Sequence, residues 1–237
     1  MNIRDANILV VDDEPILLAL YAKWLVSVGF GRVFTAANGE VALALLQLES
    51  IHLLLTDVNM PVMNGITLVR RLAEIGQTLP SIIFLSGFGD VDRREMYALG
   101  VQAFIPKPFN RQELLPLLEK AIAERSTLWQ TEMAAAPRQT LLIEANRMDA
   151  TASLDTIGLG RGGFSVYAPE PIRPGEVAFR LLLVDVAMEV AGQGYARWCS
   201  RSDSKAGIEF AFLNPDCHGW LTEAIVFASP RSFVPGS

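Results

Sequence analysis

The sequence has few of the residues that form disulfide bonds or bind transition metals. Its 237 residues include two cysteines, Cys199 and Cys217, and two histidines, His52 and His218. A disulfide scaffold needs several cysteines, and a structural zinc site needs four ligands that meet at one point. The spacing of these four residues disfavours both kinds of site. We expect the cysteines to be small buried thiols of a cytoplasmic protein.

Long apolar segments are missing as well. A helix that spans a bilayer needs about 20 consecutive apolar residues. The most apolar late stretch, residues 177–192, is interrupted by Arg180, Asp185 and Glu189. Charged residues near the N-terminus also interrupt the region in which a signal peptide would have its apolar core. The sequence therefore predicts no membrane insertion and a cytoplasmic location.

An excess of positive charge is missing from both halves of the chain, whose net charge is −6. Residues 1–125 contain 11 Lys and Arg against 14 Asp and Glu, and residues 126–237 contain 9 against 12, so each half has a net charge of −3. Proteins that bind DNA neutralise its phosphates with a basic surface. Neither half offers that surface, so no binding to DNA is expected.

The first half repeats short apolar runs followed by helical patterns. Runs of strand length alternate five times with segments in which apolar residues recur every three or four positions. Five such units in a row predict a doubly wound α/β fold, a five-stranded parallel sheet with helices on both faces. The expected strands are 7–11, 32–36, 51–58, 81–86 and 103–105, and the expected helices are 14–28, 38–49, 65–75, 90–99 and one from about residue 110.

The second half contains strand-like runs separated by Gly and Pro, and one closing helical stretch over residues 217–228. Many short strands with turn signals predict a small six-stranded antiparallel β-barrel with a C-terminal helix. The resulting domains are residues 1–125, a helical connector over 126–137, the barrel domain over 138–228 and a flexible tail over 229–237. The connector is either a helix that packs on its own domain or a dimerising helix, which leaves a homodimer possible.

Polar side chains follow four strands of the predicted parallel sheet. Asp12 and Asp13 follow the first strand, Asp57 ends the third, Ser86 ends the fourth and Lys107 follows the fifth. The carboxyl ends of parallel strands meet at one edge, so these side chains should lie together. Three carboxylates repel one another and need a hard cation such as Mg²⁺. The set suits phosphoryl transfer to a carboxylate, with the lysine and the serine binding phosphoryl oxygens.

Four motifs carry a resemblance over residues 5–125. "ILVVDDEP", "LLLTDVNMPVMNG", "IIFLSG" and "AFIPKPF" occur in this order, and together they resemble the response-regulator receiver domain, which has a flavodoxin-like fold. The resemblance implies that a sensor histidine kinase phosphorylates Asp57 and that Ser86 and Lys107 assist the transfer. It also implies a cis peptide bond between Lys107 and Pro108.

The same resemblance implies further roles around the phosphoacceptor. Asp13 and Asp57 would bind Mg²⁺ directly, and Asp12 would act mainly through water. Asn59 would contribute its backbone carbonyl to the metal. Phe104 occupies the position of the aromatic switch residue. The receiver would catalyse only its own phosphorylation and dephosphorylation, so the protein is not expected to be an enzyme with an external substrate.

The stretch "GLGRGGF" at residues 158–164 spells G-x-G-x-x-G, the pattern of dinucleotide-binding turns. That pattern binds a pyrophosphate only between a strand and a helix. The residues that follow, "FSVYAP", alternate in polarity and end in proline, which is typical of a strand. We therefore interpret the glycines as a tight turn between two strands, without a nucleotide cofactor.

The region 138–228 is similar to the PilZ domain, a six-stranded barrel that binds cyclic di-GMP. In that family the turn reads D/N-x-S-x-x-G, and here Gly158 and Gly160 replace the two polar residues while Gly163 remains. The arginine pair R-x-x-x-R that precedes the family's first strand is missing, and the match at Arg197 is expected to be ordinary exposed charge on a late strand. The chain thus lacks side chains that would bind phosphates and guanines, which disfavours cyclic di-GMP.

These observations predict a two-component response regulator whose phosphorylated receiver controls a degenerate PilZ-like domain that acts by protein contact. Its expected partners are a sensor histidine kinase and a downstream protein that the sequence does not name. The alternative is a dual-signal regulator that also binds cyclic di-GMP. An output enzyme is disfavoured because residues 138–237 contain no nucleophile, base and orienting residue at recognisable spacing.

Overall fold

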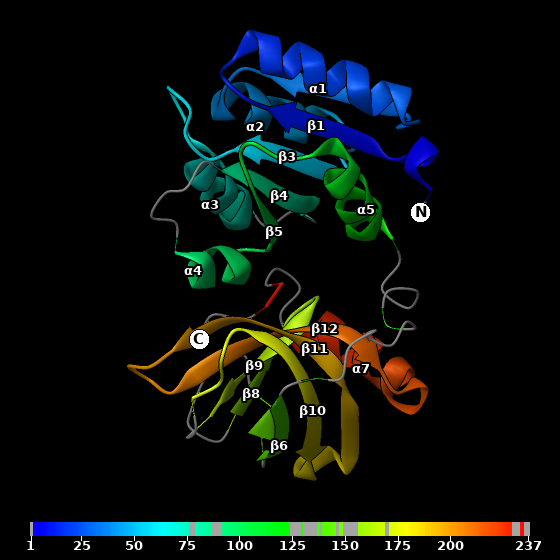
Figure 1. Cartoon of the computed structure of the whole chain (residues 1–237), viewed down its shortest axis with the longest axis vertical. Helices are drawn as coiled ribbons and strands as arrows, with labels where there is room; N and C mark the ends of the chain where they lie inside the picture. Colours follow the sequence, from blue (N-terminus) through cyan, green and yellow to red (C-terminus); the bar gives the residue numbers. More distant parts are fainter. Residues whose placement is uncertain are drawn as a thin grey trace. The chain divides into compact units, whose positions relative to one another are not determined.

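The computed structural model describes residues 2–75, 79–86, 92–123, 129, 137, 139–145, 147–148, 156–168, 171–228 and 233–234. They divide into two compact units (Figure 1). The first unit comprises Met1–Val91 and Leu99–Ala123, and the second comprises Asp92–Ala98 and Glu124–Ser237. The segment Asp92–Ala98 thus groups with the second half of the chain, although its place in the sequence lies in the first. Within the described ranges, no helix is long and apolar enough to cross a membrane.

The first unit is built on a five-stranded sheet in which every neighbouring pair is parallel. The spatial order β2-β1-β3-β4-β5 reverses the direction of winding between β1 and β3. Such a reversal opens a site at the carboxyl ends of the strands. The predicted doubly wound α/β fold is confirmed. The strands are β1 (Asn7–Val11), β2 (Arg32–Ala36), β3 (Leu53–Asp57), β4 (Ser81–Ser86) and β5 (Val101–Pro106).

Capping residues fix where the helices of the first unit begin. The side chain of Asn38 accepts a hydrogen bond from the backbone of Val41, and that of Asn110 accepts one from Gln112. Each cap satisfies one of the N–H groups that the first turn of a helix leaves without an internal partner. The helices of this unit are α1 (Pro15–Ser27), α2 (Gly39–Leu48), α3 (Gly65–Ile75) and α5 (Arg111–Ile122), preceded by a short 3₁₀ turn, η1 (Ile3–Asp5).

The central strands of this sheet are buried on both faces. All five residues of β3 are buried, as are four of the five in β1. Ile8 and Val10 share a core cluster with Leu25 of α1 and Leu114 of α5. Successive side chains of a strand point to opposite faces, so Leu9 and its alternate neighbours face the other layer. This burial explains why the strands read as nearly continuous apolar runs.

The second unit contains a single curled sheet of seven strands in the order β6-β10-β11-β12-β9-β8-β7 (Figure 1). The prediction of six antiparallel strands is wrong in two places: β6 pairs with β10 in parallel, and the two-residue strand β7 pairs with β8 in parallel. The strands are β6 (Gln139–Ala145), β7 (Arg147–Met148), β8 (Thr156–Leu159), β9 (Gly163–Tyr167), β10 (Gly175–Leu183), β11 (Met188–Ser200) and β12 (Lys205–Leu213).

Aromatic rings fill the core of the second unit. Phe164, Phe179 and Phe210 pack together with centroid separations of 5.0, 5.6 and 5.7 Å. Trp129 of the connector is 2% exposed and packs edge-on against Phe210 at 5.8 Å. This residue belongs to the core of the second unit, whereas the rest of the connector except Pro137 falls outside the described residues. The remaining elements are η2 (Val184–Val186), η3 (Pro215–Cys217), the closing helix α7 (His218–Ala228) and α4 (Arg93–Ala98).

The glycine-rich stretch forms a hairpin turn, as predicted. It joins β8 and β9, which pair antiparallel, so a strand follows the glycines where a dinucleotide site needs a helix. The backbone N–H of Gly160 donates to the carbonyl of Gly163 at 2.8 Å, and that of Gly162 donates to the carbonyl of Phe233 at 2.8 Å. A Cβ atom at Gly163 would overlap the carbonyl of Ile208, so this position needs glycine for close strand packing.

The expectation that Arg197 is ordinary exposed charge is wrong. Its Nε donates to Oε2 of Glu209, a residue that is only 4% exposed. The pairing of β11 with β12 shifts register between Ala196 and Trp198, which makes Arg197 the extra residue of a bulge. Arg197 therefore stands beside a buried carboxylate, and alternation along the strand could not show that this part of the outward face is covered.

Two residues of the tail are packed, contrary to the expected flexibility of residues 229–237. Val234 is fully buried, and the backbone N–H of Phe233 donates to the carbonyl of Tyr97 at 2.9 Å. All three residues belong to the second unit. The other tail residues fall outside the described part of the chain.

Candidate functional site

Three strands of the first unit bring charged side chains to one edge of the sheet. Asp57 is the last residue of β3, Asp12 directly follows β1, and Lys107 directly follows β5. Because β1 and β3 are neighbours in the parallel sheet, their carboxyl ends lie side by side. The carboxylates are nearly inaccessible, since Asp12 is 1% exposed and Asp57 is 7% exposed. The sheet therefore holds two acids together in a buried position.

The Lys107 ammonium bridges the two carboxylates. Its Nζ lies 2.8 Å from Oδ2 of Asp12 and 2.6 Å from Oδ1 of Asp57. Burial alone would lower the pKa of Lys107, but the hydrogen bonds and charges of both acids outweigh it and raise the pKa above its ordinary value of 10.5. The lysine is therefore a fixed cation at neutral pH. As the resemblance implied, the bond between Lys107 and Pro108 is cis.

Backbone N–H groups orient the other oxygen of each acid. The N–H of Glu14 donates to Oδ1 of Asp12 at 3.0 Å, and the N–H of Asn59 donates to Oδ2 of Asp57 at 2.8 Å. Both donors lie two residues after the acid that they bind, which is the local geometry of an Asx turn. The loops after β1 and β3 therefore fix the direction of the carboxylates before any ligand arrives.

A close backbone approach supports the loop after Asp57. A Cβ atom at Gly65, the first residue of α3, would overlap the backbone carbonyl of Asp57. Between them, Val62 is 74% exposed and has a φ of 68°, a left-handed conformation that a β-branched residue rarely adopts. The loop is thus held in a conformation that the surrounding packing imposes.

The donor atoms at this edge suit a hard divalent cation. Two carboxylate oxygens converge on one point that a positive charge already occupies, and Mg²⁺ prefers such oxygen ligands. Asp13 and Asn59, the other ligands expected from the sequence, are exposed beside them. Among the described residues, no three His, Cys, Asp or Glu side chains are gathered around one point, so the structure brings together two of the three acids. The residues present fit Mg²⁺ if Asp13 or the Asn59 carbonyl completes the set.

Ser86 and Phe104 lie on neighbouring strands of the same sheet. Ser86 is the last residue of β4 and pairs with Pro106, the last residue of β5. Its backbone thus reaches the edge at which the acids lie, while its side chain falls outside the described atoms. Phe104 is half-buried and contacts Phe84 edge-on, with ring centroids 5.7 Å apart. The expected switch residue therefore packs beside β4 in the strand that leads to Lys107.

Tyr21 is a neighbour of the site that the sequence did not indicate. It lies in α1, is 7% exposed and stacks on Phe109 at 5.7 Å. Burial raises the pKa of its phenol above 10.0; Lys107 lowers it in part, and the nearby carboxylates raise it further. Tyr21 is therefore a neutral hydroxyl close to the charged cluster. In the sequence, Tyr21 stands among apolar residues of a helix and looks like an ordinary core residue, so no local pattern could reveal that it lies close to the charged cluster.

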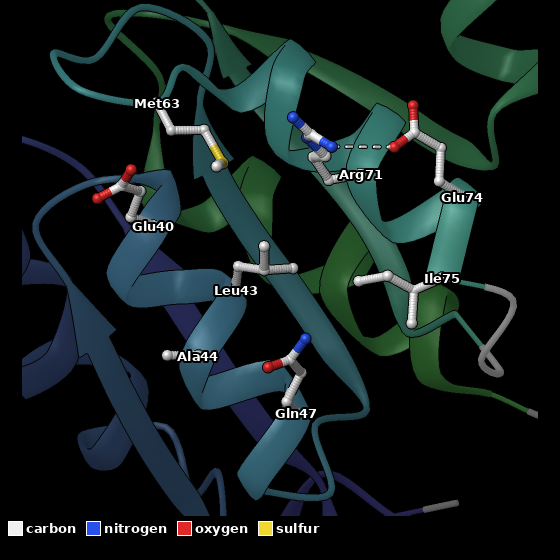
Figure 2. A pocket seen from close by; sticks show the side chains of 8 residues that line it. All are labelled: Glu40, Leu43, Ala44, Gln47, Met63, Arg71, Glu74 and Ile75. Carbon is white, nitrogen blue, oxygen red and sulfur yellow. Dashed lines mark hydrogen bonds and ion pairs between the residues drawn. The ribbon is translucent and has the colours of Figure 1, made fainter.

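A second concave feature of the first unit is the groove between α2 and α3, of about 430 Å³ (Figure 2). Leu43 of α2 and Ile75 of α3 project into it from opposite sides, and Arg71 pairs with Glu74 at its rim at 3.4 Å. Its lining contains no cysteine, serine or histidine that could act as a nucleophile or base. The groove shares no residue with the acidic edge, and the charged chemistry lies at that edge.

Known proteins resemble the first half of the chain. The family model of the response regulator receiver domain matches residues 8–119. The transcriptional regulatory protein CpxR of Klebsiella pneumoniae is 41% identical over 143 residues, which cover 59% of this chain and 59% of that protein. CpxR of Escherichia coli K12 is 42% identical over 120 residues, 51% of this chain and 50% of that protein. The chain therefore spans only about half to three-fifths of these relatives.

Solved receiver structures are similar over the same extent. The chemotaxis response regulator CheY4 of Vibrio cholerae is 32% identical, covers 49% of this chain and 98% of its own, and has a TM-score of 0.45. TrrA of Thermotoga maritima, solved in complex with Mg²⁺ and BeF, is 28% identical, covers 49% of this chain and 98% of its own, and has a TM-score of 0.44. Given the family match, the parallel sheet and the two acids bridged by lysine, residues 8–119 of this chain form a response regulator receiver domain.

Proposed function

We propose that this protein is a two-component response regulator that a sensor histidine kinase phosphorylates on Asp57. The observation that carries the proposal is the Lys107 ammonium held between Asp12 and Asp57. A carboxylate at the end of a central strand can attack a phosphorus atom that approaches the open sheet edge. The fixed cation beside it lowers the cost of bringing a charged phosphoryl group to two acids.

The reaction moves one phosphoryl group. An oxygen of Asp57 forms a bond to phosphorus as the bond from phosphorus to the imidazole nitrogen of the kinase histidine breaks, and the leaving imidazole keeps the electron pair and takes up a proton. Asp12, Asp13, Asp57 and the Asn59 carbonyl would hold Mg²⁺, which supplies positive charge to the phosphoryl oxygens. Lys107 stays protonated throughout, since its pKa lies above 10.5. Ser86, at the end of β4, would donate a hydrogen bond to a phosphoryl oxygen.

The second unit would be the output module, and we infer that it acts by contact with another protein. Its glycine turn between two antiparallel strands and its closing helix support a degenerate PilZ-like domain. Against the alternative of cyclic di-GMP binding, the N–H groups of Gly160 and Gly162 already donate to backbone carbonyls and are not available to a phosphate. Gly158 and Gly160 also carry no side chain to replace the missing polar contacts.

Phosphate incorporation tests the proposed receiver function. Incubation with Mg²⁺ and a small phosphodonor should add one phosphate to the wild type, and Asp57→Asn should abolish it. Asp5→Asn is the matched control, because Asp5 is an exposed carboxylate at the start of the same unit. Full incorporation by Asp57→Asn, measured by intact mass, would assign the phosphate to another residue.

Calorimetry tests the output unit. Titration of the full chain with cyclic di-GMP should give no binding at low micromolar concentration. Binding at that concentration, weakened by substitution of Arg138 or Arg147, would instead support the dual-signal alternative. Capture of a partner from the native cell, with and without phosphorylation of Asp57, would then identify the output contact.

A further inference from the structure

Helix α4 is anchored within the second unit by a basic side chain. Nη2 of Arg94 lies 2.8 Å from Oδ2 of Asp203, and its guanidinium lies 4.7 Å from the ring centroid of Trp198. The ion pair with Arg94 is also among the causes that lower the pKa of Asp203, after its hydrogen bond with Ser200. An arginine that pairs with a carboxylate and covers an indole ring makes a directional contact.

The C-terminal residues contact the same helix one turn after Arg94, and therefore on the same face. The ring of Phe233 stacks on Tyr97 of α4 with centroids 6.4 Å apart and an angle of 27° between the rings. The backbone of Phe233 also bridges two elements: its N–H donates to the carbonyl of Tyr97 at 2.9 Å, and its carbonyl accepts from Gly162 at 2.8 Å. Phe233 therefore links α4 to the glycine turn by one ring contact and two hydrogen bonds.

Two glycines make room for these residues on the outer face of the sheet. A Cβ atom at Gly162 would overlap the ring of Phe233, and one at Gly207 of β12 would overlap the indole of Trp198 and approach Val234 to 2.7 Å. Neither glycine has the positive φ that would itself demand glycine. Because these two glycines have no side chain, they leave the space in which Phe233, Val234 and Trp198 pack.

The length of α4 makes these contacts decisive. With six residues, it is far shorter than the ~12–15 residues at which an isolated helix becomes marginally stable. Met96 and Tyr97 are 1% and 4% exposed, so packing rather than intrinsic helix stability holds this helix in place. Its described partners include Asp203, Trp198 and the tail residue Phe233 of the second unit.

We propose that Phe233 and Val234 form a C-terminal clasp that holds α4 against the glycine turn before β9 and against β11 and β12 of the second unit. α4 lies in sequence between β4, which ends at Ser86, and β5, so the clasp holds a helix that follows the phosphorylation edge in the chain. A phosphoryl group on Asp57 that draws on Ser86 must then act against the clasp, so loss of the clasp should make phosphorylation easier. This regulatory consequence rests on the proposed function, whereas the clasp itself does not.

Hydrogen exchange on the full-length chain tests the clasp without any phosphodonor. Phe233→Ala should speed amide exchange in residues 92–98 at least tenfold, with little change in β1 and β3. Gly162→Ala should do the same, because its Cβ displaces the Phe233 ring, and the double variant should exchange no faster than either single one. Leu142→Ala is the control, since Leu142 is a 66% exposed apolar residue of β6. Unchanged exchange in Phe233→Ala, additive effects in the double variant, or an equal effect in Leu142→Ala would overturn the clasp.

Phosphorylation kinetics test the regulatory consequence. Phe233→Ala should accept phosphate from a small phosphodonor about three to ten times faster than the wild type, and Leu142→Ala should match the wild type. A rate equal to that of the wild type in a variant with fast exchange at 92–98 would overturn the regulation while the clasp stands. Failure of the wild type itself to accept phosphate at Asp57 would instead refute the proposed function, and the exchange result would still decide the clasp.

Discussion

Each unit places a basic side chain against buried carboxylates, in the first at the edge of a parallel sheet and in the second on the outer face of a curled one. Lys107 serves two acids, Asp12 and Asp57, so its cluster keeps an excess negative charge. Arg197 serves one acid, Glu209, and its guanidinium also stacks 4.9 Å from the centroid of Tyr195. The cluster around Lys107 can therefore still attract a cation. The pair of Arg197 and Glu209 has no net charge, so it does not attract one.

This difference in net charge distinguishes a binding site, around Lys107, from a structural ion pair, between Arg197 and Glu209. Burial would lower the pKa of Arg197, but the charge of Glu209 outweighs it and raises the pKa, as the two acids do for Lys107. Similar electrostatics thus occur in both units, and the shift of pKa alone does not identify function. What distinguishes the receiver site is the unequal number of charges and its position at the carboxyl ends of the strands.

The largest expected effect comes from breaking the pair of the second unit. Arg197→Met should lower the free energy of unfolding by about 3 kcal/mol, because it leaves the Glu209 carboxylate buried without its cation. Arg180→Met is the matched control: Arg180 pairs with Glu189 between β10 and β11, but their side chains are 59% and 42% exposed, so the loss should stay below ~1 kcal/mol. Urea denaturation followed by circular dichroism measures both. Equal losses would mean that burial does not distinguish the two pairs.

A smaller effect is expected from a glycine that supports the receiver site. Gly65→Ala should destabilise the first unit by about 2 kcal/mol and slow phosphate incorporation, because the new Cβ collides with the Asp57 carbonyl. Gly219→Ala, also at the start of a helix but with no atom within 4 Å of its Cβ, should change stability by less than ~0.5 kcal/mol. Unaltered incorporation in Gly65→Ala would show that this backbone approach does not position Asp57.

The receiver site was predictable because its signals are local. Asp57, Asp12 and Lys107 each stand directly after an apolar run of strand length, and a parallel sheet must gather such strand ends. The sequence could not indicate that Lys107 bridges the two acids, because that contact depends on how β1, β3 and β5 are placed by the core.

The second unit was less predictable because its key features are not local. The bulge at Arg197 depends on how β11 pairs with β12, and nothing in the sequence of one strand marks it. Val234 is buried beside Gly207, which lies 27 residues earlier, so its packing is not visible in the sequence of the tail. The parallel pairing of β6 with β10 likewise depends on a long connection that periodicity does not reveal.

Removing the lysine should sharpen the contrast in charge between the two clusters. Lys107→Met should raise the affinity for Mg²⁺ about tenfold, or ~1.4 kcal/mol, because the ammonium no longer competes for the same two carboxylates. Calorimetry with MgCl₂ measures this, and Lys23→Met, an exposed lysine of α1, is the control. Since the pKa of Lys107 is raised above 10.5, its charge is present below that value and is lost only as pH rises through the raised pKa. The difference between variant and wild type should therefore stay constant from pH 7 to 10, and a difference that fades within that range would contradict the bridged geometry.

The smallest expected effect is on the rate at which the two cysteines are alkylated. Both cysteines lie in the second unit, so this rate reports on that unit alone. Burial raises the pKa of the Cys199 thiol above 9.0, and it raises that of Cys217, whose thiol donates to the carbonyl of Asn214 at 3.0 Å. Alkylation needs the thiolate, so at pH 8 both should react at least ~10-fold more slowly than a cysteine in an unfolded peptide. Arg197→Met should speed the reaction by opening the second unit, and Lys107→Met should leave it unchanged, because its effect is confined to the receiver site. Faster labelling in Lys107→Met would mean that the two clusters are energetically coupled, and the contrast between an open site and a closed pair would then fail.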